Sequence, residues 1–173
     1  MVYRQTTPRD VSCARLGMTI GERCNREVVY VDREVTVHAA CKLMRHYHVG
    51  SLVVVDETDG ASVDGQRQPV GIITDSDIVV EVNAMDLDPK VMTAGDIMSP
   101  DLITVAESVG IAQTIALMRL KGIRHLPVIN DENHLVGIVT LDDLLVMLAD
   151  ELSDLAHVVS REPMRDGRTR TSA

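Results

Sequence analysis

Residues 71–78 read GIITDSDI, and residues 137–144 read GIVTLDDL. Both stretches contain a glycine, two apolar residues, a threonine, two further residues and an aspartate, in that order. The apolar part is typical of a short buried strand. A threonine that stands three residues before an acidic residue is typical of the first turn of a helix. Each stretch is therefore predicted to be a strand that passes directly into a helix.

The repetition extends far beyond these two stretches. Gly21 falls on Gly95 when the sequence is shifted by 74 positions, and the same shift holds without a gap to Asp56. The loop that follows is eight residues longer in the first copy, after which Gly71 falls on Gly137. An ungapped match over so many residue types indicates two copies of one unit. The identical pairs include Val31 with Val105, Val35 with Val109, Leu43-Met44-Arg45 with Leu117-Met118-Arg119, and Leu52 with Leu126.

Each copy is predicted to fold in the order β-α-β-β-α, because its apolar residues alternate between helical spacing and short β-branched runs. A unit of about 60 residues is marginal alone, so two units should pack sheet against sheet. The predicted fold class is α/β, and more narrowly α+β, with two pseudo-symmetric units. The elements are expected at residues 28–30, 32–47, 51–56, 71–74 and 75–86, and again at 102–104, 106–121, 125–130, 137–140 and 141–152.

The predicted units are residues 17–85 and 86–150. Residues 1–16 form an N-terminal segment that could be disordered, and residues 151–173 form a helix extension and an Arg-rich polar tail. An apolar stripe on this extension requires a partner, which could be the N-terminal segment or a second copy of the chain. A homodimer is the expectation. The stripe consists of Leu148, Leu152, Leu155 and Val159.

Composition and charge exclude several functional classes. The net charge of −9 disfavours a nucleic-acid partner, and the absence of Trp and Phe removes platforms for stacked bases. No run of eighteen apolar residues is present for a membrane span. The first twenty residues contain Arg and Asp where a signal peptide needs an apolar stretch, so a cytoplasmic location is expected. His46 and His48 stand two residues apart on a helix and do not share a face, so no metal site is expected.

With the repeat and both motifs established, the chain resembles a tandem pair of cystathionine β-synthase (CBS) domains, a Bateman-type module. The resemblance covers about residues 17–150 and rests on the duplicated G-h-h-T-x-x-D motif and on GIRHLPVIN at residues 122–130. It implies two clefts, related by a pseudo-twofold axis, that bind adenosine-containing ligands such as AMP, ADP, ATP, S-adenosylmethionine or a dinucleotide. It also implies no catalysis, and the two repeats leave no room for a catalytic domain. In this family two modules commonly assemble into a flat disc.

The resemblance assigns Asp77 and Asp143 to a ribose, and Thr74 and Thr140 to a ribose or phosphate. The chemistry is suitable, because a carboxylate can accept two hydrogen bonds from the adjacent hydroxyls of a sugar. The threonine hydroxyl would stand beside free N–H groups at a helix N-terminus, where a phosphate is favoured. The alternative is that Thr-x-x-Asp is only a capping box, whose loss would cost about 0.5–2 kcal/mol of stability. Both roles can coexist at the mouth of a cleft.

A phosphate beside these aspartates needs a compensating cation, because a helix terminus supplies only about half a charge. The second copy offers Arg124 and His125, whereas the first copy has Gly50 and Ser51 at the matching positions. The two clefts should therefore not bind identically. Which cleft Arg124 and His125 serve is open at this point, and the alternatives are a solvent-exposed arginine and a buried core histidine.

By resemblance, adenine would contact main-chain groups and apolar walls near the first strand of each copy. The matching residues are Val29 and Tyr30 in the first copy, and Ile103 and Thr104 in the second. The same residues would also suit an edge strand.

The leading hypothesis is a stand-alone regulatory module with no enzymatic activity and no required cofactor. Its ligand would be an adenosine derivative, and its output would pass to an unknown effector protein. The alternative is a dimerisation or interaction scaffold whose clefts are degenerate and empty.

Overall fold

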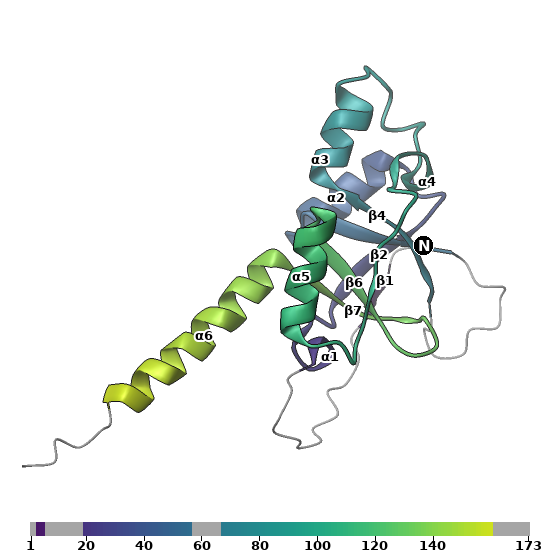
Figure 1. Cartoon of the computed structure of the whole chain (residues 1–173). Coiled ribbons are helices and arrows are strands. Elements are labelled where there is room, and N and C mark those ends of the chain that lie inside the picture. The colour runs from purple at the N-terminus through teal and green to yellow at the C-terminus, as the bar shows by residue number, and fades with distance from the viewer. Residues whose placement is uncertain (1–2, 6–18, 57–66, 161–173) are drawn as a thin grey trace, which may run out of the picture.

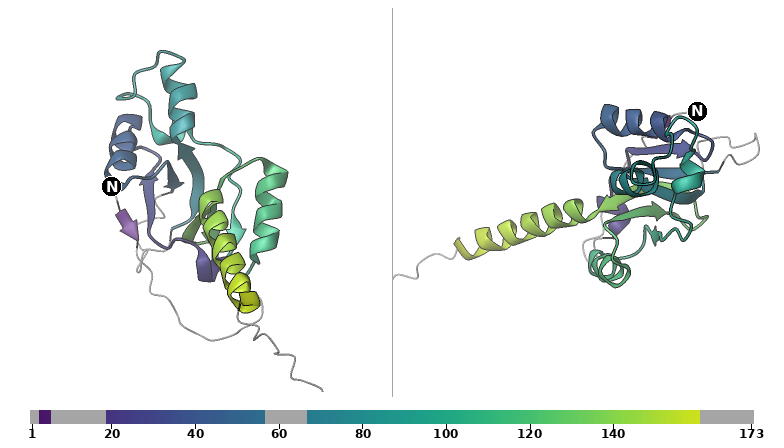
Figure 2. Two further views of the ribbon diagram at one scale, coloured as in Figure 1. Left: turned by 90° about the vertical axis from the view of Figure 1, so that its left-hand side faces the viewer. Right: turned by 90° about the horizontal axis from the view of Figure 1, so that it is seen from above.

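The computed structural model describes residues 3–5, 19–56 and 67–160. Most of the predicted N-terminal segment and the Arg-rich tail at residues 161–173 lie outside the described residues. Within the described part, two β-sheets face each other and helices lie on their outer sides (Figure 1 and Figure 2). The predicted α+β fold with two pseudo-symmetric units is confirmed.

The first sheet has the strand order β1-β2-β3-β4. β2 and β3 are parallel and are joined through helix α2, whereas β3 and β4 form an antiparallel hairpin. The sequence did not predict β1, which pairs antiparallel with the outer edge of β2. These elements are β1 (Tyr3–Gln5), β2 (Val28–Asp32), α2 (Val37–Tyr47), β3 (Ser51–Val55) and β4 (Pro69–Thr74).

The second sheet has the order β5-β6-β7 and repeats the same connections, with helix α5 between its parallel strands. The symmetry extends to the hairpin irregularities, because the register shifts between Val54 and Val55 and again between the equivalent Val128 and Ile129. The elements are β5 (Val105–Ala106), α5 (Ile111–Lys121), β6 (His125–Ile129) and β7 (Leu135–Thr140).

The two long helices before the hairpins end in the same backbone conformation but with different residues. Helix α2 ends at His48 with φ of 54°, and helix α5 ends at Gly122 with φ of 67°. A left-handed residue at this position is a common way to close a helix, and glycine adopts it without steric cost. The first copy therefore accepts a strained conformation to place a histidine where the second copy has glycine.

Successive side chains along the strands of the first sheet point to opposite faces, so the buried residues form two separate clusters. Val29 and Val31 face the helices of the first unit, whereas Val28 and Tyr30 lie between the sheets in a cluster that also contains Leu135 of β7. Both faces are buried, which explains why β3 is a continuous apolar run and not an alternating one. This central cluster confirms the predicted sheet-to-sheet packing.

Two short helices are exchanged between the units. Helix α1 (Ile20–Arg23) precedes the first sheet, yet Ile20 and Cys24 belong to the core of the second unit. Helix α4 (Ala94–Ile97) precedes the second sheet, yet the N–H of Ala94 donates to the carbonyl of Val35 at 2.7 Å in the first unit. The two short helices lie at opposite ends of the molecule (Figure 1). Each unit is therefore completed by a segment that the chain places before the other sheet.

The motif glycines make this exchange possible. A Cβ atom on Gly137 would meet the Sγ of Cys24 and lie 3.1 Å from the carbonyl oxygen of Asn25, and a Cβ on Gly71 would likewise meet Met98. Cys24 and Met98 are equivalent in the repeat and directly follow the exchanged helices. The glycines are thus required for close packing between the units.

Gly137→Ala is expected to lower the free energy of unfolding by about 1–3 kcal/mol, because the new methyl group overpacks a contact that includes backbone. Gly50→Ala is the matched control, since its Cβ would lie 3.7 Å from the nearest heavy atom. Equilibrium urea unfolding of both variants measures the difference. Equal stability of Gly137→Ala and the control would show that α1 can move away without cost.

The helices after the hairpins differ between the copies. The first copy has a single α-turn, α3 (Asp75–Asp77), followed by a π-helical segment, η1 (Ile78–Asn83). A run of β-branched residues crowds the α-helical backbone here, and π-turns are often found beside functional sites. The second copy has one straight helix, α6 (Leu141–Ser160), which projects from the body in Figure 1 and in the right-hand view of Figure 2. None of the described helices combines the length and the apolar composition that a membrane crossing requires.

Candidate functional site

The Thr-x-x-Asp motif of the first copy forms a reciprocal cap where β4 passes into α3. Both the backbone N–H and the hydroxyl of Thr74 donate to Oδ2 of Asp77 at 2.8 Å. The N–H of Asp77 donates in turn to the hydroxyl oxygen of Thr74 at 3.2 Å. These bonds fix the carboxylate and use one of its two oxygens. Among the described residues, no hydrogen bond reaches Oδ1 of Asp77, so this oxygen remains able to accept hydrogen bonds from a ligand.

The second copy has the same geometry, with donor distances of 2.8 and 2.7 Å from Thr140 to Oδ2 of Asp143. A third cap of this kind, Thr93 with Asp96, starts the short helix α4. Hydrogen bonds from the backbone and hydroxyl of Thr93 lower the pKa of Asp96. The capping-box alternative is thus confirmed as a local structure, and the motif alone does not make a binding site.

One part of the predicted chemistry is wrong for the first copy. The N–H groups at the start of α3 are not free, because that of Asp75 donates to the carbonyl of Gly50 at 3.0 Å and that of Ser76 donates to the Asp75 carboxylate at 2.8 Å. The N–H of Asp77 is used by the cap. A phosphate would therefore find no vacant backbone donor in this turn, and a side-chain cation must hold it.

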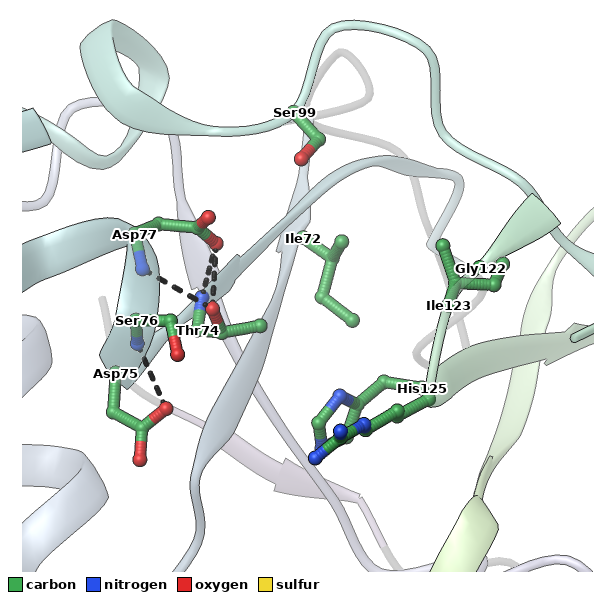
Figure 3. Close-up of a pocket in the computed structure, with 10 residues that line it drawn as sticks. Ile72, Thr74, Asp75, Ser76, Asp77, Ser99, Gly122, Ile123 and His125 are labelled. Atoms are coloured by element: carbon green, nitrogen blue, oxygen red, sulfur yellow. Dashed lines mark hydrogen bonds between the residues drawn. The ribbon is translucent and has the colours of Figure 1, made fainter. Parts of the chain in front are cut away.

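What distinguishes the caps at Thr74 and Thr140 is that each borders a cleft between the units. The Thr74 cleft has a cavity volume of about 470 Å³. Figure 3 shows Thr74 and Asp77 on one side of it, His125 and Ile123 on the other, and Ile72 between them. The cleft is lined by Ile72, Thr74, Asp75, Ser76, Asp77, Ser99, Gly122, Ile123, Arg124 and His125.

The Thr140 cleft is the pseudo-symmetric counterpart, with a cavity volume of about 300 Å³. Here Thr140 and Asp143 come from the second unit, and the loop from His48 to Ser51 comes from the first. Thr93 and Asp96 are not among the residues that line either cleft. The Thr140 cleft is lined by Asn25, Glu27, Val28, Val29, His48, Val49, Gly50, Ser51, His125, Ile138, Thr140, Asp142 and Asp143.

The loop before β6 serves the cleft of the other unit. The carbonyl of Arg124 accepts the N–H of Leu141 at 2.9 Å, so its backbone is fixed beside the helix of its own unit. Arg124 nevertheless lines the Thr74 cleft, where it is the one arginine or lysine among the lining residues. Gly50 has the mirrored arrangement and lines the Thr140 cleft. Arg124 therefore lies in the same cleft as the Thr-x-x-Asp motif of the opposite copy.

His125 lies between the clefts and lines both. Its pKa is lowered, mainly by burial and further by the positive charge of Arg124, although Asp75, Asp142 and Asp143 oppose this shift. Because the ordinary histidine pKa is near 6.5, the imidazole is neutral at neutral pH and offers one donor and one acceptor. His125 therefore brings a hydrogen-bonding group, not a charge, to the centre of the molecule.

The predicted adenine contacts are placed unevenly. Val29 lines the Thr140 cleft, whereas Tyr30 is buried between the sheets. Ile103 packs on the core of the second unit, and neither it nor Thr104 is among the described residues that line the Thr74 cleft. Roles for these four residues stay predictions.

The family model of the CBS domain matches residues 20–84 and again residues 94–150. The chain belongs to the CBS-domain family. Its CBS pair is 37% identical over 128 residues to the uncharacterized protein MK0525 of Methanopyrus kandleri, a match that covers 74% of this chain and 61% of that relative. It is also 32% identical over 139 residues to Hypoxic response protein 1 of Mycobacterium tuberculosis, which covers 80% and 82% of the two chains.

Solved CBS pairs have the same fold. Hypoxic Response Protein I with two coordinated zinc ions matches with a TM-score of 0.62 at 30% identity, over 75% of this chain and 98% of that one. The CBS domain pair of protein MJ0100, in complex with 5′-methylthioadenosine and S-adenosylmethionine, matches with a TM-score of 0.65 at 24% identity, over 79% and 99%. In the part of this CBS pair that the structure describes, no group of three or more His, Cys, Asp or Glu residues is arranged to hold a metal ion.

Several lining residues of the CBS pair were missed by sequence reasoning. Asp75 and Asp142 add negative charge, Glu27 lines the Thr140 cleft, and Ser99 follows the exchanged helix α4. The repeat register could have identified the loop from His48 to Ser51, because it matches the loop from Gly122 to His125. Glu27 and Ser99 carried no such signal, since their positions depend on the exchange of the short helices.

Proposed function

We propose that the chain is a regulatory module that binds an adenosine-containing compound in the clefts between its two CBS units, with no catalytic role. The observation that carries this proposal is that each cleft is lined by residues from both units. A ligand in the Thr74 cleft would contact the cap of the first unit and the loop of Arg124 from the second. Binding would then depend on how the units are placed, and a ligand can shift that placement by its difference in affinity between two arrangements.

The chemistry of the clefts supports a nucleoside. Each cleft combines a fixed carboxylate with an oxygen available for sugar hydroxyls and an isoleucine wall, Ile72 in one cleft and Ile138 in the other. Their volumes lie at the lower end of the range for small-molecule sites. The ligands in the MJ0100 pair are adenosine compounds, although that likeness concerns the fold and the proposal rests on the residues of this chain.

The exposed face of α6 favours a second role, self-association. Helix α6 presents a line of exposed leucines. Leu141, at the start of the helix, is 38% exposed, and the others are more than 40% exposed. Their spacing alternates between four and three residues, which is the seam of a two-helix coiled coil. We propose that a second copy of this chain covers this stripe and that an effector protein reads the shape of the dimer. The stripe consists of Leu141, Leu145, Leu148, Leu152 and Leu155.

Isothermal titration calorimetry of the full chain tests the proposed function. AMP, ATP, adenosine, 5′-methylthioadenosine, S-adenosylmethionine and NADH are titrated separately, with GMP as a control for the base. At least one adenosine compound is expected to bind with a stoichiometry of one or two per chain and to raise the melting temperature. If none binds at millimolar concentration, the scaffold with empty clefts is the correct function.

A further inference from the structure

The two clefts carry different charges although the motif is the same. The Thr74 cleft contains two carboxylates, Asp75 and Asp77, and the guanidinium of Arg124. The Thr140 cleft contains the carboxylates of Asp142 and Asp143, and its lining residues include no arginine or lysine.

The difference originates in one pair of equivalent positions. Gly50 and Arg124 match in the repeat, both accept a hydrogen bond from the first N–H of the helix in their own unit, and both line the opposite cleft. Arginine at one position supplies a planar fork suited to a phosphate. Glycine at the other position leaves the carboxylates of the Thr140 cleft without a counter-ion from this loop.

His125 does not compensate the difference in charge between the two clefts. His125 lines both clefts, so it cannot distinguish them, and burial keeps its imidazole neutral at neutral pH. His48 lines the Thr140 cleft alone, from a left-handed backbone conformation that costs it stability. An N–H of its imidazole can donate a hydrogen bond to a neutral ligand.

Extending the proposed function, on which this inference rests, we infer that the two clefts select adenosine compounds by charge. The Thr74 cleft takes a phosphorylated ligand such as AMP, because Arg124 compensates the phosphate. The Thr140 cleft takes a ligand without net negative charge, and its carboxylates favour a cationic group such as the sulfonium of S-adenosylmethionine. A phosphate placed beside Asp142 and Asp143 would be repelled, since opposite charges at close range favour binding and like charges oppose it.

A reciprocal substitution tests the inference. Arg124→Gln removes the cation from the Thr74 cleft and keeps most of the side-chain volume. Gly50→Arg places a cation in the Thr140 cleft, where the backbone permits it, because φ is outside the left-handed region and a Cβ has 3.7 Å to the nearest heavy atom. Calorimetric titrations with AMP, adenosine and S-adenosylmethionine measure affinity and stoichiometry for the wild type and both variants.

The wild type is expected to bind AMP at one site, and Arg124→Gln should weaken this binding at least about tenfold, while adenosine changes less than about threefold. Gly50→Arg should create a second AMP site and weaken S-adenosylmethionine. Asp142→Asn is a second route to the same result, because it removes one carboxylate of the Thr140 cleft from an exposed position. It applies if Gly50→Arg fails to fold.

The outcomes separate this inference from the proposed function. AMP filling both wild-type clefts with similar affinity, or Arg124→Gln weakening AMP and adenosine equally, would overturn charge selection and leave nucleoside binding intact. Absence of binding by every adenosine compound would overturn both. A gain of AMP stoichiometry in Gly50→Arg or Asp142→Asn supports the inference directly.

Discussion

Removing the two cleft aspartates is expected to abolish adenosine binding, whereas removing a third aspartate of identical geometry should leave it unchanged. In Asp77→Ala and Asp143→Ala, the ligand loses two hydrogen bonds to a carboxylate, each worth about 1.5–3 kcal/mol. Affinity at the cleft concerned should fall about 100-fold or more. Titration calorimetry measures each loss with the adenosine compound that binds the cleft concerned in the wild type, and the double variant should bind none.

Asp96→Ala is the matched control for this experiment. Asp96 accepts the same two hydrogen bonds from Thr93, at 2.8 Å each, but lines neither cleft. All three substitutions remove one cap and should cost about 0.5–2 kcal/mol of stability. If Asp77→Ala and Asp143→Ala lose only the stability that Asp96→Ala loses, the aspartates are caps alone and the clefts have no role in ribose recognition.

The contrast between these caps explains how much of the site could be predicted. Thr-x-x-Asp is a local signal that specifies hydrogen bonds within one turn, and the structure contains it at each predicted position. A cap becomes part of a cleft only when a segment from the other unit lies opposite. That arrangement depends on tertiary packing, which the motif does not encode.

The fold was predicted more completely than the site because the repeat is a global constraint. Two copies of a β-α-β-β-α unit that is too small to be stable alone can hardly avoid packing together. The register also indicated that Arg124 and Gly50 are equivalent, but equivalence does not say toward which cleft a side chain points. The structure supplies that answer, because both loops are tied by a carbonyl to their own helix and line the opposite cleft.

The exchange of α1 and α4 and the bond that engages the N–H of Asp75 were beyond sequence reasoning. Both depend on hydrogen bonds between residues distant in the chain, such as the N–H of Gly21 to the carbonyl of Glu107 at 2.9 Å. The motif glycines carried a signal for the exchange, since a glycine inside a strand often marks a close approach of another segment. The approaching segment itself could not be named from the sequence.

Leu152→Asp is expected to convert the proposed dimer into a monomer without loss of fold. Leu152 is 67% exposed in the single chain, so the substitution removes little burial from the monomer. In a symmetric coiled coil it would place two charges in the seam and remove two buried leucines, each worth about 1.5–3 kcal/mol. The dissociation constant of the dimer should rise about 100-fold or more.

The leucine stripe of α6 carries no charge of its own that would oppose a second copy. The acidic residues Asp150 and Asp154 lie off the leucine stripe, and Glu151 pairs with Arg23 of its own chain at 3.6 Å, so the seam itself carries no uncompensated charge. Two chains of net charge −9 repel each other at long range, so association should strengthen as salt screens this repulsion.

Sedimentation velocity at low and moderate ionic strength measures both effects, and circular dichroism verifies that the helix is retained. Ser153→Asp adds the same charge outside the stripe and should leave the dimer intact. A monomeric wild type, or equal dissociation in both variants, would show that something other than a second copy covers these leucines.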